Sequence, residues 1–341
     1  MKTIAMCALL AALAFGLLPG NRDEAAAADE GLVLLVETQQ DAQAPQKASS
    51  ARQNQSEKAA VQTAPDAQTV RLLDGGAVTA LSMEDYLTGV LLSEMPADFE
   101  PEARKAQAVA ARTFTCRKLL QPKHENADVC AEASCCQAWT SREQLRQKYG
   151  ASFDAVWSAA REAVRQTAGE VLTYDGQLID AVYFSCSGGA TEAAVAVWGT
   201  DVPYLQAVES PGEEAAPRFS SRAVFSPEEF SQRLMQENPD VQLSGSPDTW
   251  LGETTRSAGG GAATCSIGGV SFSGTQLRRM FGLNSTRLTL SYQDGDFVFD
   301  VTGFGHRVGM SQYGAQTMAQ LGFSYQTILQ YYYQGAEVER Q

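Results

Sequence analysis

The stretch from Gly303 to Ala315 combines residue types that bind ligands more readily than they build a core. It places His306, one of only two histidines in the chain, among four glycines and next to Ser311 and Gln312. Glycines let the backbone adopt positive φ and approach a ligand closely, and the polar side chains offer hydrogen bonds that a plain turn does not need. We expect a binding or catalytic loop, with Ser311 capping a helix that ends at Gly322.

A carboxylate at the end of a predicted helix is the second candidate for chemistry. Ser82 is placed to cap that helix, and Pro96 disfavours helical geometry at the residue before it, so Glu94 lies at or near the helix exit. By spacing alone, a solvated glutamate is the commoner case. The apolar neighbours of Glu94 would desolvate its carboxyl and favour the protonated form that a general acid needs.

Two cations follow on the next predicted helix, which begins near Pro101 and runs to about Leu120. Lys105 and Arg112 are seven residues apart and therefore share a face. They can present positive charge to Glu94 or to a substrate.

One histidine and three cysteines within thirteen residues meet the requirements of a closed structural zinc site. These four are His124, Cys130, Cys135 and Cys136. Their spacing is not that of a standard zinc finger, and disulfides are the alternative in an exported protein. Adjacent cysteines rarely bridge each other, which favours a metal.

A nucleophile is a weaker alternative. Cys186 and Ser187 precede two glycines, but the segment lacks the first glycine of the G-x-S-x-G turn. A serine triad would have to recruit His306 without an obvious orienting acid, and a Cys186–His306 dyad is chemically possible.

The elements that must position these residues show no regular alternation of strand and helix. Asp-Gly pairs at 74–75 and 175–176 lie between apolar runs and predict hairpins, the second joining 171–174 to 180–184. The stretch 244–263, rich in Gly, Ser and Thr, predicts a surface loop or a connection between lobes. Further helices are expected after Ser226 and Ser324, and further strands at 265–267, 270–272, 288–290 and 297–301. The mixture predicts an α+β fold.

The first 69 residues are expected to lie outside the folded core of the protein. An apolar run between Lys2 and Pro19 makes residues 1–20 a signal peptide or a membrane anchor, and either one exports the protein. Residues 21–69 are predicted to be a disordered spacer, because 39–68 has almost no aromatic or branched residues to bury.

The chain carries a net charge of −14 with a pI near 4.7. Neither nucleic acid nor an anionic membrane surface is an attractive partner for such a protein. A polymer would have to be bound in a local groove by hydrogen bonds, stacking and a few placed cations.

Three blocks of sequence resemble the SpoIID/LytB family, whose members act on peptidoglycan during sporulation and wall lysis. They lie in the order expected for that family, within roughly residues 70–341. The blocks are Leu91–Pro96 with Pro101–Thr113, Tyr183–Gly189 with Trp198–Gly199, and Gly303–Ala315.

The resemblance implies a lytic transglycosylase with a two-lobed body and a substrate groove. Glu94 falls at the position of the family's catalytic acid, which protonates the glycosidic oxygen and then, as a base, helps the C6 hydroxyl of N-acetylmuramic acid close an anhydro ring. A usual glycoside hydrolase would need two carboxylates. The resemblance also implies that the groove is lined by Ser187, Thr191, His306, Ser311 and Gln312.

Some members of the family hold a structural zinc with two cysteines and two histidines. Here Cys130 and Cys136 would keep the cysteine places and His124 one histidine place, while Cys135 would replace the other histidine. Four protein ligands would leave no open position on the metal.

The resemblance further implies a membrane-anchored protein with its catalytic part outside the cytoplasm. It would act in forespore engulfment on glycan strands stripped of their stem peptides, together with a SpoIIP-like amidase and a SpoIIM-like membrane protein. Two rivals stay open. One is a non-catalytic wall-binding enhancer of an amidase, and the other is a zinc amidase using His306 and His124, which lacks an H-E-x-x-H motif.

Overall fold

The computed structural model describes residues 69–341. The predicted signal peptide or anchor and, except for Thr69, the predicted spacer lie outside these residues. The chain forms two compact units, each described here by itself. The helical unit comprises residues 69–182, Trp198–Tyr204 and Met318–Gln341, and the strand-rich unit comprises Tyr183–Val197 and Leu205–Thr317.

The helical unit begins with the predicted hairpin. β1 (Thr69–Asp74) pairs antiparallel with β2 (Ala77–Ser82), and β3 (Val129–Cys130) adds to β1 in parallel, giving the order β2-β1-β3. The Ser82 side chain accepts a hydrogen bond from the Asp85 amide and so caps α2 (Met83–Glu94), as its sequence predicts. Glu94 is the last residue of that helix.

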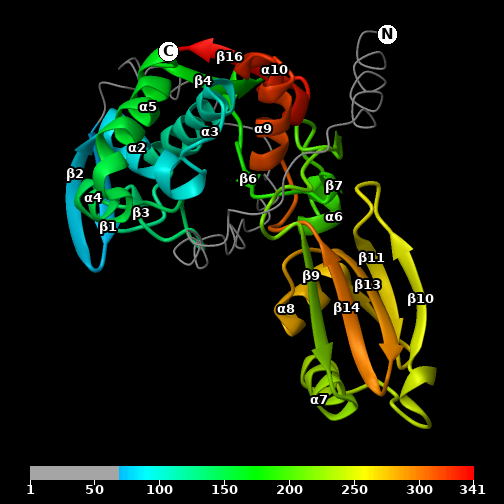
Figure 1. Cartoon of the computed structure of the whole chain (residues 1–341). Helices are drawn as coiled ribbons and strands as arrows, with labels where there is room; N and C mark the ends of the chain where they lie inside the picture. The colour runs from blue at the N-terminus through cyan, green and yellow to red at the C-terminus, as the bar shows by residue number, and fades with distance from the viewer. Residues whose placement is uncertain (1–68) are drawn as a thin grey trace, which may run out of the picture. The chain divides into compact units, whose positions relative to one another are not determined.

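α3 (Pro101–Leu120) is the central helix of this unit and starts with Pro101 in its first turn. Its alanine-rich face allows close packing against α2, α5, α10 and β4. Figure 1 shows α2, α3 and α5 lying side by side. The remaining elements of the unit are α4 (Arg142–Tyr149), a 3-10 turn (Gly150–Ser152), α5 (Phe153–Gln166), β4 (Glu170–Tyr174), β5 (Gln177–Leu178), α10 (Tyr325–Tyr332) and β16 (Glu337–Arg340).

The strand-rich unit contains two three-stranded antiparallel sheets, ordered β10-β11-β12 and β13-β14-β9. Helices α7 and α8 supply Phe230 and Phe281 to a core that also holds Phe297 and Phe299 of β14 (Figure 1). These elements are β9 (Ser220–Phe225), α7 (Pro227–Glu237), a 3-10 turn (Pro247–Thr249), β10 (Leu251–Arg256), β11 (Ala262–Ile267), β12 (Val270–Ser273), α8 (Gly274–Phe281), β13 (Arg287–Gln293) and β14 (Asp296–Thr302).

Short elements complete this unit and carry the glycine-rich loops. β6 pairs with β15 in parallel and β7 with β8 antiparallel. These elements are β6 (Tyr183–Phe184), β7 (Gly189–Ala190), β8 (Glu209–Ser210), β15 (Met310–Ser311) and the greater part of α6 (Ala194–Trp198) and of α9 (Gln312–Gln320).

The α+β class is confirmed, and so are the capped helices after Ser226 and Ser324 and the strands predicted between 265 and 301. Two local predictions are wrong. The stretch 244–263 is no lobe connection, because it contains β10 and the start of β11 inside one unit. The turn at Asp175 joins β4 to β5 and not to 180–184, where β6 pairs instead with β15.

None of the helices between residues 69 and 341 has the length and apolar character needed to cross a membrane.

Candidate functional site

Glu94 occupies the position that its sequence predicts, at the C-terminal end of α2. Met95 leaves the helix with extended backbone, and the neighbours Leu91, Leu92 and Met95 are each 2% exposed. The Glu94 side chain is half-buried, and its Oε1 accepts a hydrogen bond of 2.7 Å from the Ala138 amide. A carboxylate that is held among buried apolar side chains and still has partial access to solvent is suited to proton transfer.

Two further carboxylates follow Glu94 closely in sequence, and both differ from it in exposure. Asp98 is exposed in the loop after α2, and Glu100 is exposed at the N-cap of α3. The helical unit therefore offers one shielded carboxylate at this end of α2.

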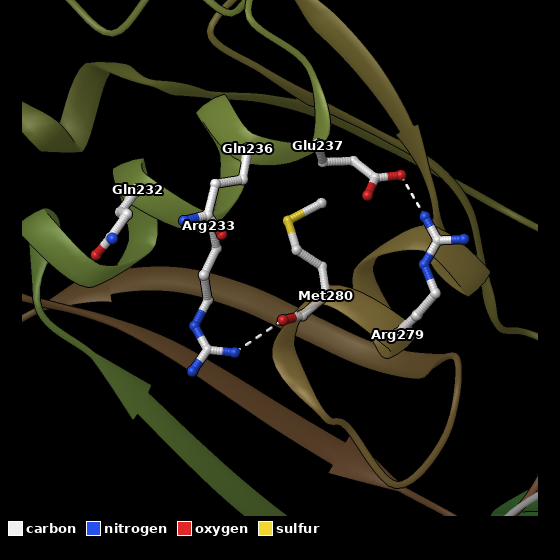
Figure 2. A pocket seen from close by; sticks show the side chains of 6 residues that line it. All are labelled: Gln232, Arg233, Gln236, Glu237, Arg279 and Met280. Carbon is white, nitrogen blue, oxygen red and sulfur yellow. Dashed lines mark hydrogen bonds and ion pairs between the residues drawn. The ribbon is translucent and has the colours of Figure 1, made fainter.

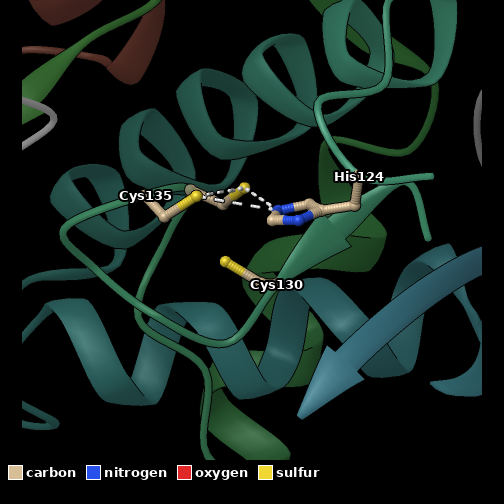
Figure 3. Close-up of side chains that lie close together, drawn as sticks. His124, Cys130 and Cys135 are labelled. Atoms are coloured by element: carbon tan, nitrogen blue, oxygen red, sulfur yellow. Dashed lines mark hydrogen bonds between the residues drawn. The ribbon is translucent and has the colours of Figure 1, made fainter. Parts of the chain in front are cut away.

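The four predicted metal ligands come together. The side-chain donor atoms of His124, Cys130, Cys135 and Cys136 all lie within 4.8 Å of one another. Figure 3 shows His124, Cys130 and Cys135 converging from a loop and from β3. We call these four residues the thiol–imidazole cluster.

The distances among the donor atoms of His124, Cys135 and Cys136 are close to those around a tetrahedral metal. His124 Nε2 lies 3.6 Å from Sγ of both Cys135 and Cys136, and the two sulfurs are 4.0 Å apart. Ligand atoms about 2.0–2.3 Å from a shared zinc lie roughly 3.4–3.8 Å apart in a tetrahedron. A hydrogen bond from Cys136 lowers the pKa of Cys130 to about 5, which favours one thiolate at neutral pH.

The disulfide alternative receives no support from the structure. All six cysteines of the described residues are unbridged, and three of them belong to the thiol–imidazole cluster. The others are Cys116, Cys186 and Cys265, which are all buried.

The two cations predicted to share a face of α3 differ in exposure and in their partners. The Lys105 ammonium forms an ion pair of 2.7 Å with Glu102 and is only partly exposed. The Arg112 side chain is fully buried and donates to the carbonyl oxygens of Val164 and Glu170. The structure gives the predicted substrate contact of Arg112 no support, since its guanidinium joins α5 to β4 within the core.

His306 is also buried, at 4% exposure, and both of its ring nitrogens are bonded to backbone. Nε2 donates to the Tyr183 carbonyl at 3.0 Å, and Nδ1 accepts from the Val308 amide at 3.1 Å. Burial, together with the smaller effect of the positive charge of Arg278, lowers the pKa of His306 to about 3. The imidazole is neutral, and its bond to the Tyr183 carbonyl holds β6 next to the glycine-rich loop, residues 303–309.

The same pattern holds for three other residues predicted to line a groove. Ser187 Oγ donates to the Ser210 carbonyl, Thr191 Oγ1 accepts from the Val208 amide, and Ser311 Oγ donates to the Ser185 carbonyl. Each of the three side chains is fully buried. Their hydroxyls join loops of the strand-rich unit.

Gln312 differs from its neighbours. It is 2% exposed, yet its Nε2 has no hydrogen-bond partner within residues 69–341. An unsatisfied buried amide costs free energy. Among the predicted groove residues, Gln312 is therefore the one whose side chain can still donate a hydrogen bond to a ligand.

The nucleophile alternatives are disfavoured by burial. Cys186 is fully buried, and desolvation raises the pKa of its thiol to about 12. His306 cannot act as its base with both ring nitrogens bonded to backbone. The same bonding argues against His306 as a ligand of a catalytic zinc.

Sequence reasoning missed the ion pair that holds the glycine-rich loops. Arg307 pairs with Glu192 at 3.0 Å, and both side chains are buried. The guanidinium also donates to the carbonyls of Ser187 and Gly259. A positive φ of 67° at Arg307 accompanies these contacts, but the sequence carries no local pattern that reveals them.

A hollow of about 500 Å³ between α7 and α8 adds no candidate chemistry. Arg233 donates to the Met280 carbonyl, and Arg279 pairs with Glu237, so its cations are bonded to the unit itself. Figure 2 shows the lining residues Gln232, Arg233, Gln236, Glu237, Arg279 and Met280.

The site thus combines one shielded carboxylate with a structural thiol–imidazole cluster in an α+β protein. Residues 74–174, which include Glu94 and the whole cluster, match the SpoIID family model, described as Stage II sporulation protein. Stage II sporulation protein D of Bacillus subtilis (strain 168) is 36% identical over 303 residues, which are 83% of this chain and 85% of that protein. Its counterpart from Bacillus amyloliquefaciens is 38% identical over 264 residues, 76% of this chain and 75% of that protein.

A third relative has a different name. The protein named Amidase enhancer of Bacillus subtilis (strain 168) is 30% identical over 301 residues, which are 73% of this chain and 39% of that protein. The chain belongs to the SpoIID family, as the resemblance predicts.

Proposed function

We propose that this protein is a peptidoglycan lytic transglycosylase with Glu94 as its single acid and base. The observation that supports this most directly is the half-buried Glu94 carboxyl, anchored by the Ala138 amide at the end of α2, whereas the neighbouring Asp98 and Glu100 are exposed. One carboxyl is enough when the C6 hydroxyl of the sugar, and not water, attacks the anomeric carbon. A hydrolase would need a second carboxylate to activate water or to form an intermediate.

The proposed substrate is the glycan strand at N-acetylmuramic acid, and the proposed setting is forespore engulfment. The names of the two Stage II sporulation protein D relatives support a role in sporulation. A SpoIIP-like amidase and a SpoIIM-like membrane protein are the proposed partners, with residues 1–20 exporting the chain or anchoring it in the cell membrane.

The thiol–imidazole cluster is proposed to bind a structural zinc ion through His124, Cys130, Cys135 and Cys136. The distances between these donor atoms and the lowered pKa of Cys130 support this assignment. A zinc ion bound there would cross-link the loop 124–136 and would have no open position for a substrate.

The test compares the protein with its Glu94→Gln variant on peptide-free glycan strands, with products identified by mass spectrometry. Anhydro-muramic ends formed by the parent and lost in Glu94→Gln are the expected result. Reducing ends would instead indicate a hydrolase.

A wall-binding enhancer of an amidase is the second candidate, favoured by the relative named Amidase enhancer. It would bind glycan strands without cleaving them, equally well with Glu94 or Gln at this position. Stimulation of a purified peptidoglycan amidase by both versions would establish it in place of the transglycosylase.

A further inference from the structure

The residues that follow the thiol–imidazole cluster run along α2 and contact it repeatedly. The Gln137 side chain donates to the Tyr86 hydroxyl at 3.3 Å, and the Ser93 hydroxyl donates to Thr140 Oγ1 at 2.8 Å. Between these contacts, the Ala138 amide donates to Glu94 Oε1 at 2.7 Å. We call residues 137–140 the α2 clamp.

The clamp approaches α2 so closely that the helix must carry a glycine there. A Cβ atom at Gly89 would overlap the indole nitrogen of Trp139 and would lie 3.0 Å from the Thr140 carbonyl oxygen. Glycine inside a helix costs about 1 kcal/mol relative to alanine. The close packing of Trp139 on bare backbone gives that cost a structural reason.

The clamp is also fixed from its other side. Gln137 Nε2 donates to Thr115 Oγ1 of α3 at 3.0 Å, and the Trp139 amide donates to the Ala131 carbonyl at 3.2 Å. Gln137 is 1% exposed, so these bonds are shielded from water. The Ala138 amide therefore has a defined position relative to both helices.

We propose that the α2 clamp orients the catalytic acid, with the Ala138 amide as its positioning group. This proposal rests on the proposed role of Glu94. An oxygen that accepts an N–H acts as the carbonyl oxygen of a protonated carboxyl, so the Ala138 amide assigns Oε1 to that role and the transferable proton to Oε2.

The assignment serves both steps of the reaction. In the first, the proton moves from Oε2 to the glycosidic oxygen as the bond from that oxygen to the anomeric carbon breaks. In the second, the C6 hydroxyl bonds to the anomeric carbon and returns its proton to Oε2. Oε1 keeps the same N–H bond throughout, so the carboxyl does not need to rotate between steps. A fixed orientation of this kind lowers the cost of reaching the transition state.

The first experiment measures hydrogen exchange at the Ala138 amide by NMR and does not depend on activity. In Glu94→Gln, the side-chain carbonyl can still accept the N–H, and protection should stay close to that of the parent. In Glu94→Ala, the acceptor is lost, and exchange should accelerate at least about tenfold. Equal protection in the two variants would overturn the proposal.

The second experiment removes the donor alone by replacing Ala138 with lactic acid, which turns the amide into an ester. The matched control is the same replacement at Ala168, an exposed residue outside the clamp whose amide donates to the Arg165 carbonyl at 3.1 Å. On glycan strands, the Ala138 ester should lower kcat by about tenfold to hundredfold with KM unchanged, the range expected for one bond to a charged group. The Ala168 ester should leave kcat near that of the parent.

The outcomes separate the two proposals. If Glu94→Gln cleaves as the parent does, the proposed function fails and this inference fails with it. If Glu94→Gln is inactive while both esters keep equal kcat values, the proposed function stands and the clamp is overturned.

Discussion

His306 shows how a single residue can be committed to structure. Its ring lies against Phe184, and its two nitrogens bond to backbone on β6 and in the glycine-rich loop. Such a histidine contributes to stability only while it is neutral. Its ordinary pKa of 6.5 is lowered to about 3 in the folded protein by burial.

The stability of the protein should therefore depend on pH through His306. Between pH 6.5 and pH 3 the unfolded chain binds a proton that the folded protein does not, so the His306 contribution is complete above pH 6.5 and is lost as the pH falls. The slope is at most about 1.4 kcal/mol per pH unit. Urea unfolding of the parent and of His306→Gln should show the largest difference above pH 6.5 and a shrinking one below it. Parallel curves would contradict this assignment.

Unlike His306, the Gln312 side chain should add little to stability, because its buried Nε2 has no partner in the described part of the chain. Replacing it by methionine removes an unsatisfied group of similar size, so the free energy of unfolding should stay within about 1 kcal/mol or increase. Affinity for glycan strands should fall about tenfold if the amide contacts sugar. Unchanged affinity in a binding titration would remove Gln312 from the predicted groove.

At the scale of elements, the contact between α2 and the α2 clamp decides the effect of Gly89→Ala. The substitution would stabilise an isolated helix by about 1 kcal/mol. Here the new Cβ would collide with Trp139, so the melting temperature should fall and exchange at Ala138 should accelerate. In a Trp139→Ala background the collision is absent, and Gly89→Ala should cost less. Equal costs in both backgrounds would show that α2 and the clamp are not coupled there.

Metal removal should weaken the contact between α2 and the α2 clamp, since Cys136 immediately precedes the clamp. A chelator should lower the melting temperature by several degrees and expose the Ala138 amide to exchange, because the proposed zinc ion would contribute to folding only while it is bound. A Cys130→Ser variant serves as the control, and the chelator should change it little. Parent protein that contains no metal after purification with zinc present would contradict the zinc assignment.

For the whole molecule, the net charge of −14 determines how binding responds to salt. Peptide-free glycan strands carry lactyl carboxylates, so protein and polymer repel each other at low ionic strength. Affinity should rise by about twofold or more between 10 and 150 mM salt, because the Debye length falls from about 30 to 8 Å. Neutral chitin oligomers, used as the control ligand, should show a smaller change. A steep loss of affinity with salt would instead reveal a cationic binding surface.

The sequence by itself determined the local structure and the inventory of the site. The turn at Asp74–Gly76, the caps at Ser82 and Ser324, and the place of Glu94 at a helix end all depend on residues a few positions apart. The thiol–imidazole cluster is equally local, because its four residues lie within thirteen positions of sequence. Interactions of this range can be read from residue types and their spacing.

Only the tertiary structure decided which polar groups are free for chemistry. Ala138 reaches Glu94 across 44 positions of sequence, and His306 reaches Tyr183 across 123. Arg112, which looks like a surface cation by periodicity, is buried because its partners come from α5 and β4. A polar side chain binds a ligand or holds the fold according to whether distant segments satisfy it, and that depends on packing that no local pattern records.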